Sequence, residues 1–252
     1  MANYGTCKYC GKEKELCKAH IVPKKFYLDY TTERYRSIDQ DFNKEYAQSG
    51  IWDDTILCGD CDNKLNEYDK EGYKILLNAL KTKEKTINDI PKAYLFKEGE
   101  DFDYINLRFF FISLLWRASI SSKAMYNKVN LGKFEDIALS ILKNEKTDDE
   151  KYFQTIVFRE PEEAPYGKVH YCIKSKFDNV ICYKIFFTKF IVCIIPNTKH
   201  CRASKGLEYL KLAFNKNEFV IIEDGNSFED KRKFLNKVKK NWKQKDKICK
   251  QR

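Results

Sequence analysis

The sequence predicts an α+β protein built from three sections, and three observations support this. Two Cys-x-x-Cys pairs lie within residues 1–80, a strongly apolar helical pattern covers about 103–128, and β-branched and aromatic runs fill 152–222. We therefore expect an N-terminal module at 1–80, an α+β domain at 81–226 and a basic amphipathic helix at 227–252.

The first section ends in an amphipathic helical pattern, in which apolar residues recur at spacings of three and four. These residues are Leu65, Tyr68, Leu76, Leu77 and Leu80. Residues 26–50, between the two cysteine pairs, are polar and rich in tyrosine, which predicts an irregular excursion or a short hairpin.

The second section is expected to begin after a polar connector at 81–102. Its first helix, at about 103–128, has apolar residues around most of its circumference and should therefore be buried. A second helix is expected at about 132–144.

Strands should follow the two helices and form an antiparallel sheet. The expected strands are Tyr152 to Phe158, Val169 to Ile173, Val180 to Phe187, Phe190 to Ile195 and Phe219 to Glu223. Ile185 to Ile195 is almost entirely apolar, which indicates that part of the sheet is covered on both faces.

The positive charge is concentrated near the end of the chain. The net charge is +10, and residues 229–252 alone carry eleven basic and three acidic side chains. Such a segment favours polyanionic partners, and Lys239, Lys240 and Lys243 are candidates for contacts with phosphates. The alternative is a solvated helix whose apolar stripe packs on the body of the protein.

Cysteine usage and hydropathy indicate a reduced, cytoplasmic protein. Met1 to Gly5 has no apolar stretch typical of a signal peptide, and the strongest apolar run, Phe109 to Trp116, is too short to span a bilayer. We therefore expect no membrane contact, and we expect closely spaced cysteines to bind metal rather than form disulfides.

Cys7, Cys10, Cys58 and Cys61 form the two pairs, and four thiolates are the ligand set that tetrahedral zinc prefers. Each pair has a glycine next to or within it, as tight metal-binding turns often do. The alternative is four free buried thiols, and Cys17 is a competing ligand that lacks a paired spacing. We expect a structural zinc ion whose pairs enclose an insertion.

That insertion contains Ala19-His20-Ile21-Val22-Pro23-Lys24-Lys25, and the second cysteine pair reads Leu57-Cys58-Gly59-Asp60-Cys61. With the first pair, these motifs resemble the HNH endonucleases, whose core is a zinc-stapled ββα-metal module. A related group of uncharacterised bacterial HNH-like proteins also has a helix similar to Leu114 to Ser119. The resemblance covers residues 5–75 for the first group and about 5–145 for the second.

The resemblance implies that His20 is the general base and that Asp62 occupies a metal-ligand position, where it could hold a catalytic Mg²⁺ or Mn²⁺. Asp53, at another position of the family motif, and Asp69, on the same helical face as Asp62, are candidates for a further ligand. The sequence departs from the family at Ala19, where the family has a metal-binding acid. Alternatively, Asp62 only stabilises the start of the helix, where a negative charge is favourable. The alternative for Asp69 is a position on a solvated helix face.

Three functions follow from these observations. The first is a metal-dependent endonuclease that acts on nucleic acid, expected to be DNA, with Lys24 and Lys25 attracting the backbone and a role in defence against foreign DNA. The second is a non-catalytic nucleic-acid- or protein-binding module with a degenerate site. The third is a regulatory subunit that binds a partner protein through 103–222. His170 and His200 have no catalytic pattern around them.

Overall fold

The computed structural model describes residues 3–28, 35–38, 44–47, 50–82, 85–87, 90–144, 151–161, 169–177, 180–187, 189–198, 210–213 and 216–223. The helices are α1 (Lys25–Leu28), α2 (Gly59–Lys81), α3 (Tyr104–Ile120), the 3₁₀ turn η1 (Ala124–Tyr126) and α4 (Phe134–Leu142). The first strands are β1 (Asn3–Thr6), β2 (Glu13–Leu16), β3 (Ala19–His20), β4 (Tyr35–Ile38), β5 (Lys44–Ala47) and β6 (Trp52–Asp53). The later strands are β7 (Lys85–Ile87), β8 (Ile90–Lys97), β9 (Tyr152–Arg159), β10 (Val169–Phe177), β11 (Val180–Phe187), β12 (Phe190–Asn197) and β13 (Glu218–Glu223).

A large mixed sheet forms the centre of the α+β fold. Its described strands run in the order β5-β4-β10-β11-β12-β9-β13-β8-β7. All neighbours are antiparallel except β4 with β10 and β9 with β13, which are parallel. The expectation of a purely antiparallel sheet is therefore wrong, because strands distant in sequence add to the meander β10-β11-β12 and its neighbour β9.

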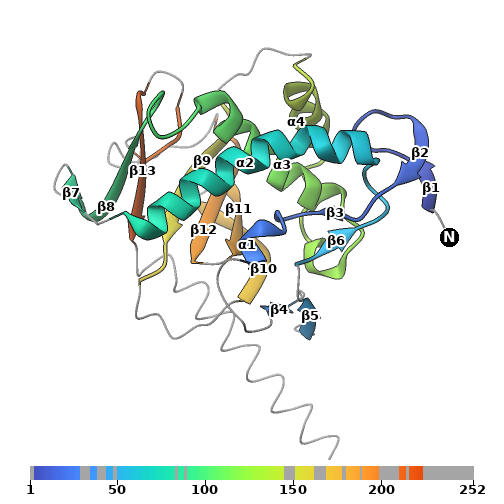
Figure 1. The fold of residues 1–252 in the computed structure, drawn as a ribbon, viewed down its shortest axis with the longest axis horizontal. Coiled ribbons are helices and arrows are strands. Elements are labelled where there is room, and N and C mark those ends of the chain that lie inside the picture. The colour runs from blue at the N-terminus through green and yellow to red at the C-terminus, as the bar shows by residue number, and fades with distance from the viewer. Residues whose placement is uncertain are drawn as a thin grey trace, which may run out of the picture.

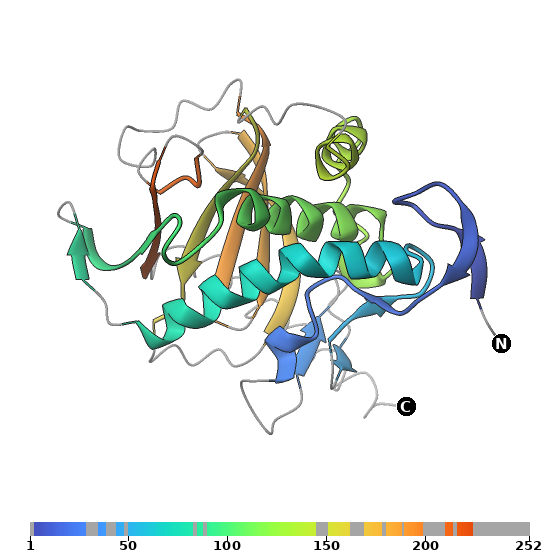
Figure 2. The same cartoon turned by 45° about the horizontal axis from the view of Figure 1, so that its top comes forward.

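Helices α2 and α3 lie side by side across one face of this sheet (Figures 1 and 2). Their approach is close at Gly72, where an added Cβ atom would lie 2.2 Å from the Phe110 ring. Tyr68 and Phe109 also meet edge to face across this contact. The three long helices predicted near 65–80, 103–128 and 132–144 are present, although α3 ends at Ile120.

Strand β12 explains the long apolar run in the sequence. Its side chains alternate between two buried clusters, with Val192 and Ile194 on the side of the helices and Ile191 and Cys193 on the opposite side. Both faces of this strand are thus covered, which confirms the prediction from composition.

One part of the organisation differs from expectation, and the short hairpin that was one alternative for residues 26–50 is present. Residues 81–102 do not form only a connector, because β7 and β8 extend the sheet beyond β13. The excursion at 26–50 contains the hairpin β4-β5, which extends the opposite edge. Strands β5 and β7 lie at the two edges of the sheet, whereas β8 carries the buried residues Ala93, Tyr94 and Phe96.

One apolar cluster contains residues from both sides of the predicted boundary at residue 80. It includes Leu65 and Leu76 from α2 together with Leu115 from α3 and Val192 from the sheet. The division into domains at 1–80 and 81–226 stays a prediction, and the tail at 227–252 lies outside the described residues. None of the described helices has both the length and the hydropathy required to cross a membrane.

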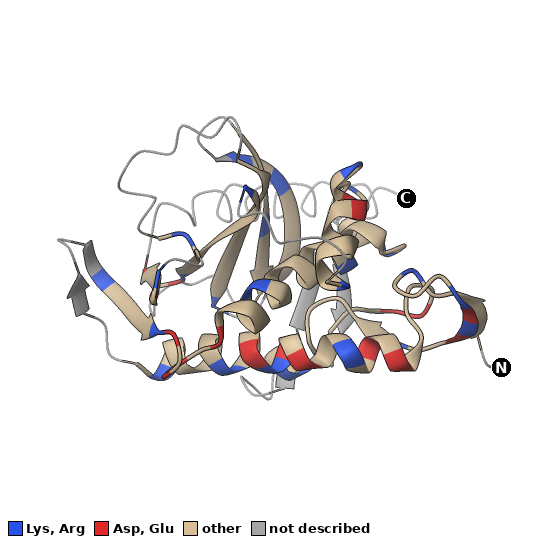
Figure 3. Cartoon of the chain, turned by 90° about the horizontal axis from the view of Figure 1, so that it is seen from above, with Lys and Arg blue, Asp and Glu red and all other residues tan. Residues whose placement is uncertain are grey.

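Strands β1 and β2 lie beyond the first turn of α2, away from the large sheet (Figure 1). Acidic and basic residues are interspersed along the ribbon of α2 (Figure 3). The two-stranded pairs β1-β2 and β3-β6 are both separate from the large sheet.

Candidate metal centre and the adjoining His20 site

The four predicted cysteines converge at the start of α2. The sulfur atoms of Cys7, Cys10, Cys58 and Cys61 all lie within 4.8 Å of one another. A tetrahedral zinc ion with Zn–S bonds of about 2.3 Å separates its ligands by roughly 3.8 Å, so the four thiols fit such an ion closely. The arrangement can hold a metal ion such as zinc.

The first pair forms a tight turn whose backbone faces the sulfur atoms. Gly11 has a φ of +73° and its N–H donates to the Cys7 carbonyl over 2.8 Å, a conformation that favours glycine. The Cys58 N–H also points at the Cys7 sulfur, at 3.4 Å. Cys58 then precedes the first turn of α2, which carries Cys61.

These contacts change the acidity of the thiols. Burial acts to raise the pKa of Cys7, but backbone hydrogen bonds at Cys10, Cys58 and Tyr9 together lower it to about 7. Burial raises the pKa of Cys61, and the neighbouring thiols add to this. A bound cation would favour the ionised form of all four thiols together, although burial alone disfavours ionisation of Cys61.

The first turn is also fastened to the rest of the protein. The Tyr9 hydroxyl donates to the carbonyl of Leu142 at the end of α4, over 2.9 Å, and its ring meets Trp116 of α3 edge to face. Cys17 stays outside the cluster, and burial raises the pKa of its thiol to about 11. The four cysteines that could hold a metal ion are therefore those that the spacing predicted.

The short strands β3 and β6 place His20 next to this centre. Ala19 pairs with Asp53 and His20 with Trp52, in antiparallel register. Because directly opposite side chains share one face of such a pair, His20 and Trp52 lie on one face and Ala19 and Asp53 on the other. Ala19 and Asp53 are fully buried. An acid in place of Ala19 would therefore be directed toward the interior, beside Asp53.

The carboxylate of Asp53 accepts five hydrogen bonds within the described part of the chain. It accepts from the N–H and hydroxyl of Thr55, from the hydroxyls of Ser121 and Ser122, and from the Ser122 N–H. Burial opposes ionisation, but these bonds dominate and lower the pKa of Asp53. The same bonds fix the chain just after α3, which explains why that helix ends earlier than its apolar pattern suggests.

Asp69 is buried in an ion pair with Arg117 of α3. The guanidinium donates to both carboxylate oxygens, over 2.9 and 2.6 Å, and also to the carbonyl of His20 over 3.0 Å. Its remaining bonds go to the carbonyl and hydroxyl of Ser113. Both oxygens of Asp69 are thus engaged, and a metal-binding role for Asp69 would require this pair to open.

Asp62 lies close enough to this pair for its charge to be affected. Burial raises the pKa of Asp62, Arg117 opposes this change, and the negative charge of Asp69 adds to it. Within the described residues, the four cysteines are the only group of three or more His, Cys, Asp or Glu side chains near enough to share an ion. His20, Asp62 and Asp69 do not form a second such group.

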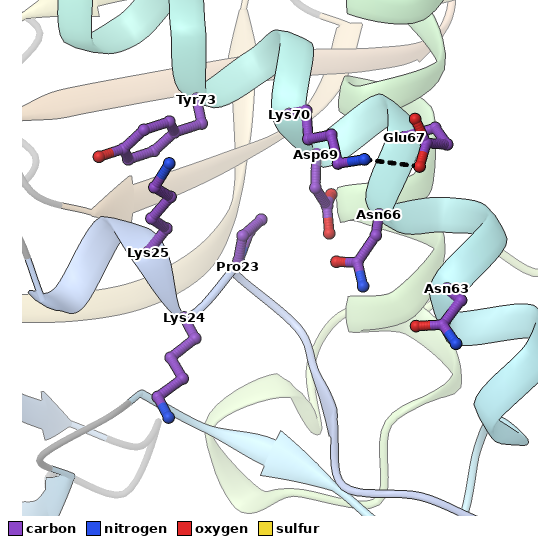
Figure 4. Close-up of a pocket in the computed structure, with 9 residues that line it drawn as sticks. All are labelled: Pro23, Lys24, Lys25, Asn63, Asn66, Glu67, Asp69, Lys70 and Tyr73. Carbon is purple, nitrogen blue, oxygen red and sulfur yellow. Dashed lines mark hydrogen bonds and ion pairs between the residues drawn. The ribbon is translucent and has the colours of Figure 1, made fainter.

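A pocket of about 550 Å³ separates the segment after His20 from α2 (Figure 4). The predicted phosphate-binding residues Lys24 and Lys25 line it, and the Lys25 ammonium lies 4.1 Å from the centre of the Tyr73 ring. The opposite wall is polar and belongs to α2. It consists of Asn63, Asn66, Glu67, Asp69, Lys70 and Tyr73.

The remaining predicted residues are not part of this site. His170 is buried in the sheet, where its ring stacks on Tyr27 and its Nδ1 lies 3.1 Å from the Tyr27 hydroxyl. His200 and the tail lysines Lys239, Lys240 and Lys243 lie outside the described residues. Reasoning from sequence missed Arg117 and Trp52, although the two arginines that flank the apolar run Phe109 to Trp116 within α3 were a signal for a buried charge.

A search of protein-family models, curated proteins and solved structures found no match to this chain. The resemblance to HNH endonucleases therefore rests on the motifs of the sequence.

We expect the purified protein to contain about one zinc ion per chain, and Cys58→Ser to lose it, because three thiolates and a hydroxyl bind zinc more weakly. The matched control is Cys17→Ser, which removes a nearby thiol outside the cluster. Metal content and thermal unfolding measure both effects. Zinc-free wild type, or equal zinc loss in the two variants, would contradict the assignment.

The hydrogen bonds of Asp53 predict a pH-dependent contribution to stability. They hold its pKa below the ordinary value of 3.8, so the stabilisation is complete above that pH and is lost as pH falls through the lower folded-state value. At pH 7, Asp53→Asn should reduce the unfolding free energy by about 1–3 kcal/mol, and the difference from wild type should shrink below about pH 4. Urea unfolding across pH measures this, with Asp54→Asn as the control. A difference that does not change with pH would refute the interpretation.

Proposed function

We propose that this chain is an HNH-like, metal-dependent nuclease that hydrolyses phosphodiester bonds in nucleic acid, with DNA as the expected substrate. The observation that carries the proposal is the position of His20 and Asp62 around one buried guanidinium. Arg117 donates to the backbone of His20, and its charge acts on Asp62.

The order of elements supports the proposal. The antiparallel pair β3-β6 is followed by α2, and the four cysteines link the segment before β3 to the start of that helix. His20 sits on one strand and Asp62 in the first turn of the helix. Two short strands followed by a helix, with a histidine on a strand and an acid on the helix, support the proposed likeness to the ββα-metal nucleases.

In the proposed reaction, His20 takes a proton from the attacking water. A neutral imidazole suits this task near pH 7. The residue is half-buried, and its Nε2 atom is itself shielded from solvent, so other atoms of His20 make its contact with water. Exposed Lys24 and Lys25, a few residues further along, attract the negatively charged backbone.

Asp62 is the carboxylate best suited to hold a divalent ion. Asp53 and Asp69 use their oxygens in hydrogen bonds with Thr55, the serines and Arg117, whereas the Asp62 carboxylate makes no hydrogen bond or ion pair within the described residues. Mg²⁺ is often held by one or two carboxylates together with substrate phosphates and water, which fits a single aspartate. When bound, the ion would neutralise charge on the phosphate and the leaving oxygen.

A second candidate is a non-catalytic nucleic-acid-binding module with the same scaffold. Ala19 and the engagement of Asp69 by Arg117 favour it, because they leave one carboxylate where a nuclease often has two ligands. A role in defence against foreign DNA, a cytoplasmic location and a protein partner bound through 103–222 stay predictions.

The two candidates differ in the effect of His20→Ala. We expect wild-type protein to nick plasmid DNA or cut oligonucleotides with Mg²⁺ or Mn²⁺, and His20→Ala to be slower by about 10²–10⁴-fold, the usual contribution of a general base. Asp62→Asn should lower activity and raise the concentration of Mg²⁺ or Mn²⁺ needed for half-maximal rate.

Asp60→Asn is the matched control, because Asp60 also lies in the first turn of α2 but is exposed and pairs with Lys14. Zinc content should stay the same in all three variants. Equal cleavage by wild type and His20→Ala would rule out the catalytic role, and binding without any cleavage would favour the second candidate.

A further inference from the structure

Trp52 is the direct cross-strand neighbour of His20. The two residues are paired in the β3-β6 register, so their side chains share one face with Cβ atoms about 4.5–5.5 Å apart. Trp52 is only partly buried, unlike Trp116 in the core. A large aromatic ring with solvent-exposed surface therefore lies beside the proposed general base.

Two lysines from separate segments lie against this ring. The Lys18 ammonium is 4.6 Å and the Lys123 ammonium 5.1 Å from the ring of Trp52. Lys18 immediately precedes β3, and Lys123 follows the serines that bind Asp53. Neither lysine forms an ion pair with a carboxylate in the part of the chain that the structure describes.

The simplest explanation for these contacts is that the lysines shield an exposed ring through cation–π attraction. That attraction is weak at exposed sites. It also leaves the positive charge of both lysines uncompensated by any described carboxylate, on the face that carries His20. Proteins bind single-stranded nucleic acid with aromatic rings on which bases stack and cations that meet the phosphates. Because the two ammonium groups lie over the ring, a stacking base would displace an ammonium, which could then pair with a flanking phosphate.

We propose that Trp52, Lys18 and Lys123 form a subsite for an unpaired nucleobase and its flanking phosphates. This rests on the proposed function, because it places the base beside the scissile phosphate. A base inside an intact duplex is stacked on both faces and cannot reach the ring. The subsite therefore selects single-stranded or locally unpaired nucleic acid.

The test uses full-length protein carrying His20→Ala, without added divalent ions, so that binding is measured without cleavage. Affinity for a fluorescent single-stranded oligonucleotide and for a blunt duplex is measured by anisotropy, with DNA and RNA versions of each. Trp52→Leu should weaken single-strand binding by roughly 5- to 100-fold, the usual effect of losing one base–aromatic stack, and change duplex binding by less than about twofold.

Trp52→Phe retains an aromatic ring and should keep most of the affinity, which separates stacking from folding defects. Tyr4→Leu is the control for an exposed aromatic residue elsewhere, since Tyr4 is 73% exposed on β1. Equal zinc content and unfolding midpoints should accompany all three variants.

The contribution of Lys18 and Lys123 is measured separately, through the salt dependence of binding. Lys18→Gln and Lys123→Gln should each reduce the slope of log affinity against log salt by about 0.7 for a single strand. Lys81→Gln, at the far end of α2, should leave the slope unchanged. Single-strand affinity that Trp52→Leu leaves unaltered, or an equal loss for duplex, would overturn the subsite. If the wild-type protein cleaves no nucleic acid but these binding effects are observed, only the nuclease proposal is overturned.

Discussion

The buried ion pair between Arg117 and Asp69 connects the parts of this protein that matter for function. Arg117 belongs to the core helix α3, Asp69 to α2, and a third bond from the same guanidinium reaches the backbone of His20. Burying both charges is costly, and it is tolerated only when geometry and hydrogen bonds compensate. Here the guanidinium makes five hydrogen bonds, so the pair can act as a fixed point around which His20 and Asp62 are placed.

Three other contacts hold the same region against the core. The four cysteines bring the first turn close to the start of α2. The Tyr9 hydroxyl bonds that turn to α4, and Asp53 bonds β6 to the serines after α3. A site that must orient a general base benefits from such rigid support. In this account the cysteine cluster supports the proposed reaction site structurally and takes no part in the reaction.

The sequence predicted the features that depend on local pattern. Cys-x-x-Cys spacing predicted the ligands, and apolar periodicity predicted α2, α3 and most strands. It could not predict features set by distant partners. The pairing of β8 with β13 joins segments far apart in sequence, and the position of Gly72 against Phe110 depends on how two helices meet. Asp69 looked like a solvent-exposed acid or a metal ligand, because nothing near it in sequence identifies Arg117 as its partner.

A double-mutant cycle in unfolding free energy tests the central role of this ion pair most directly. Arg117→Met and Asp69→Leu should each cost about 3–5 kcal/mol, since each leaves one buried charge without its partner. The double variant should cost clearly less than the two losses combined, and zinc content reports whether the cysteine cluster survives. Purely additive losses would show that the two residues act independently, and would contradict their role as a shared fixed point for His20 and Asp62.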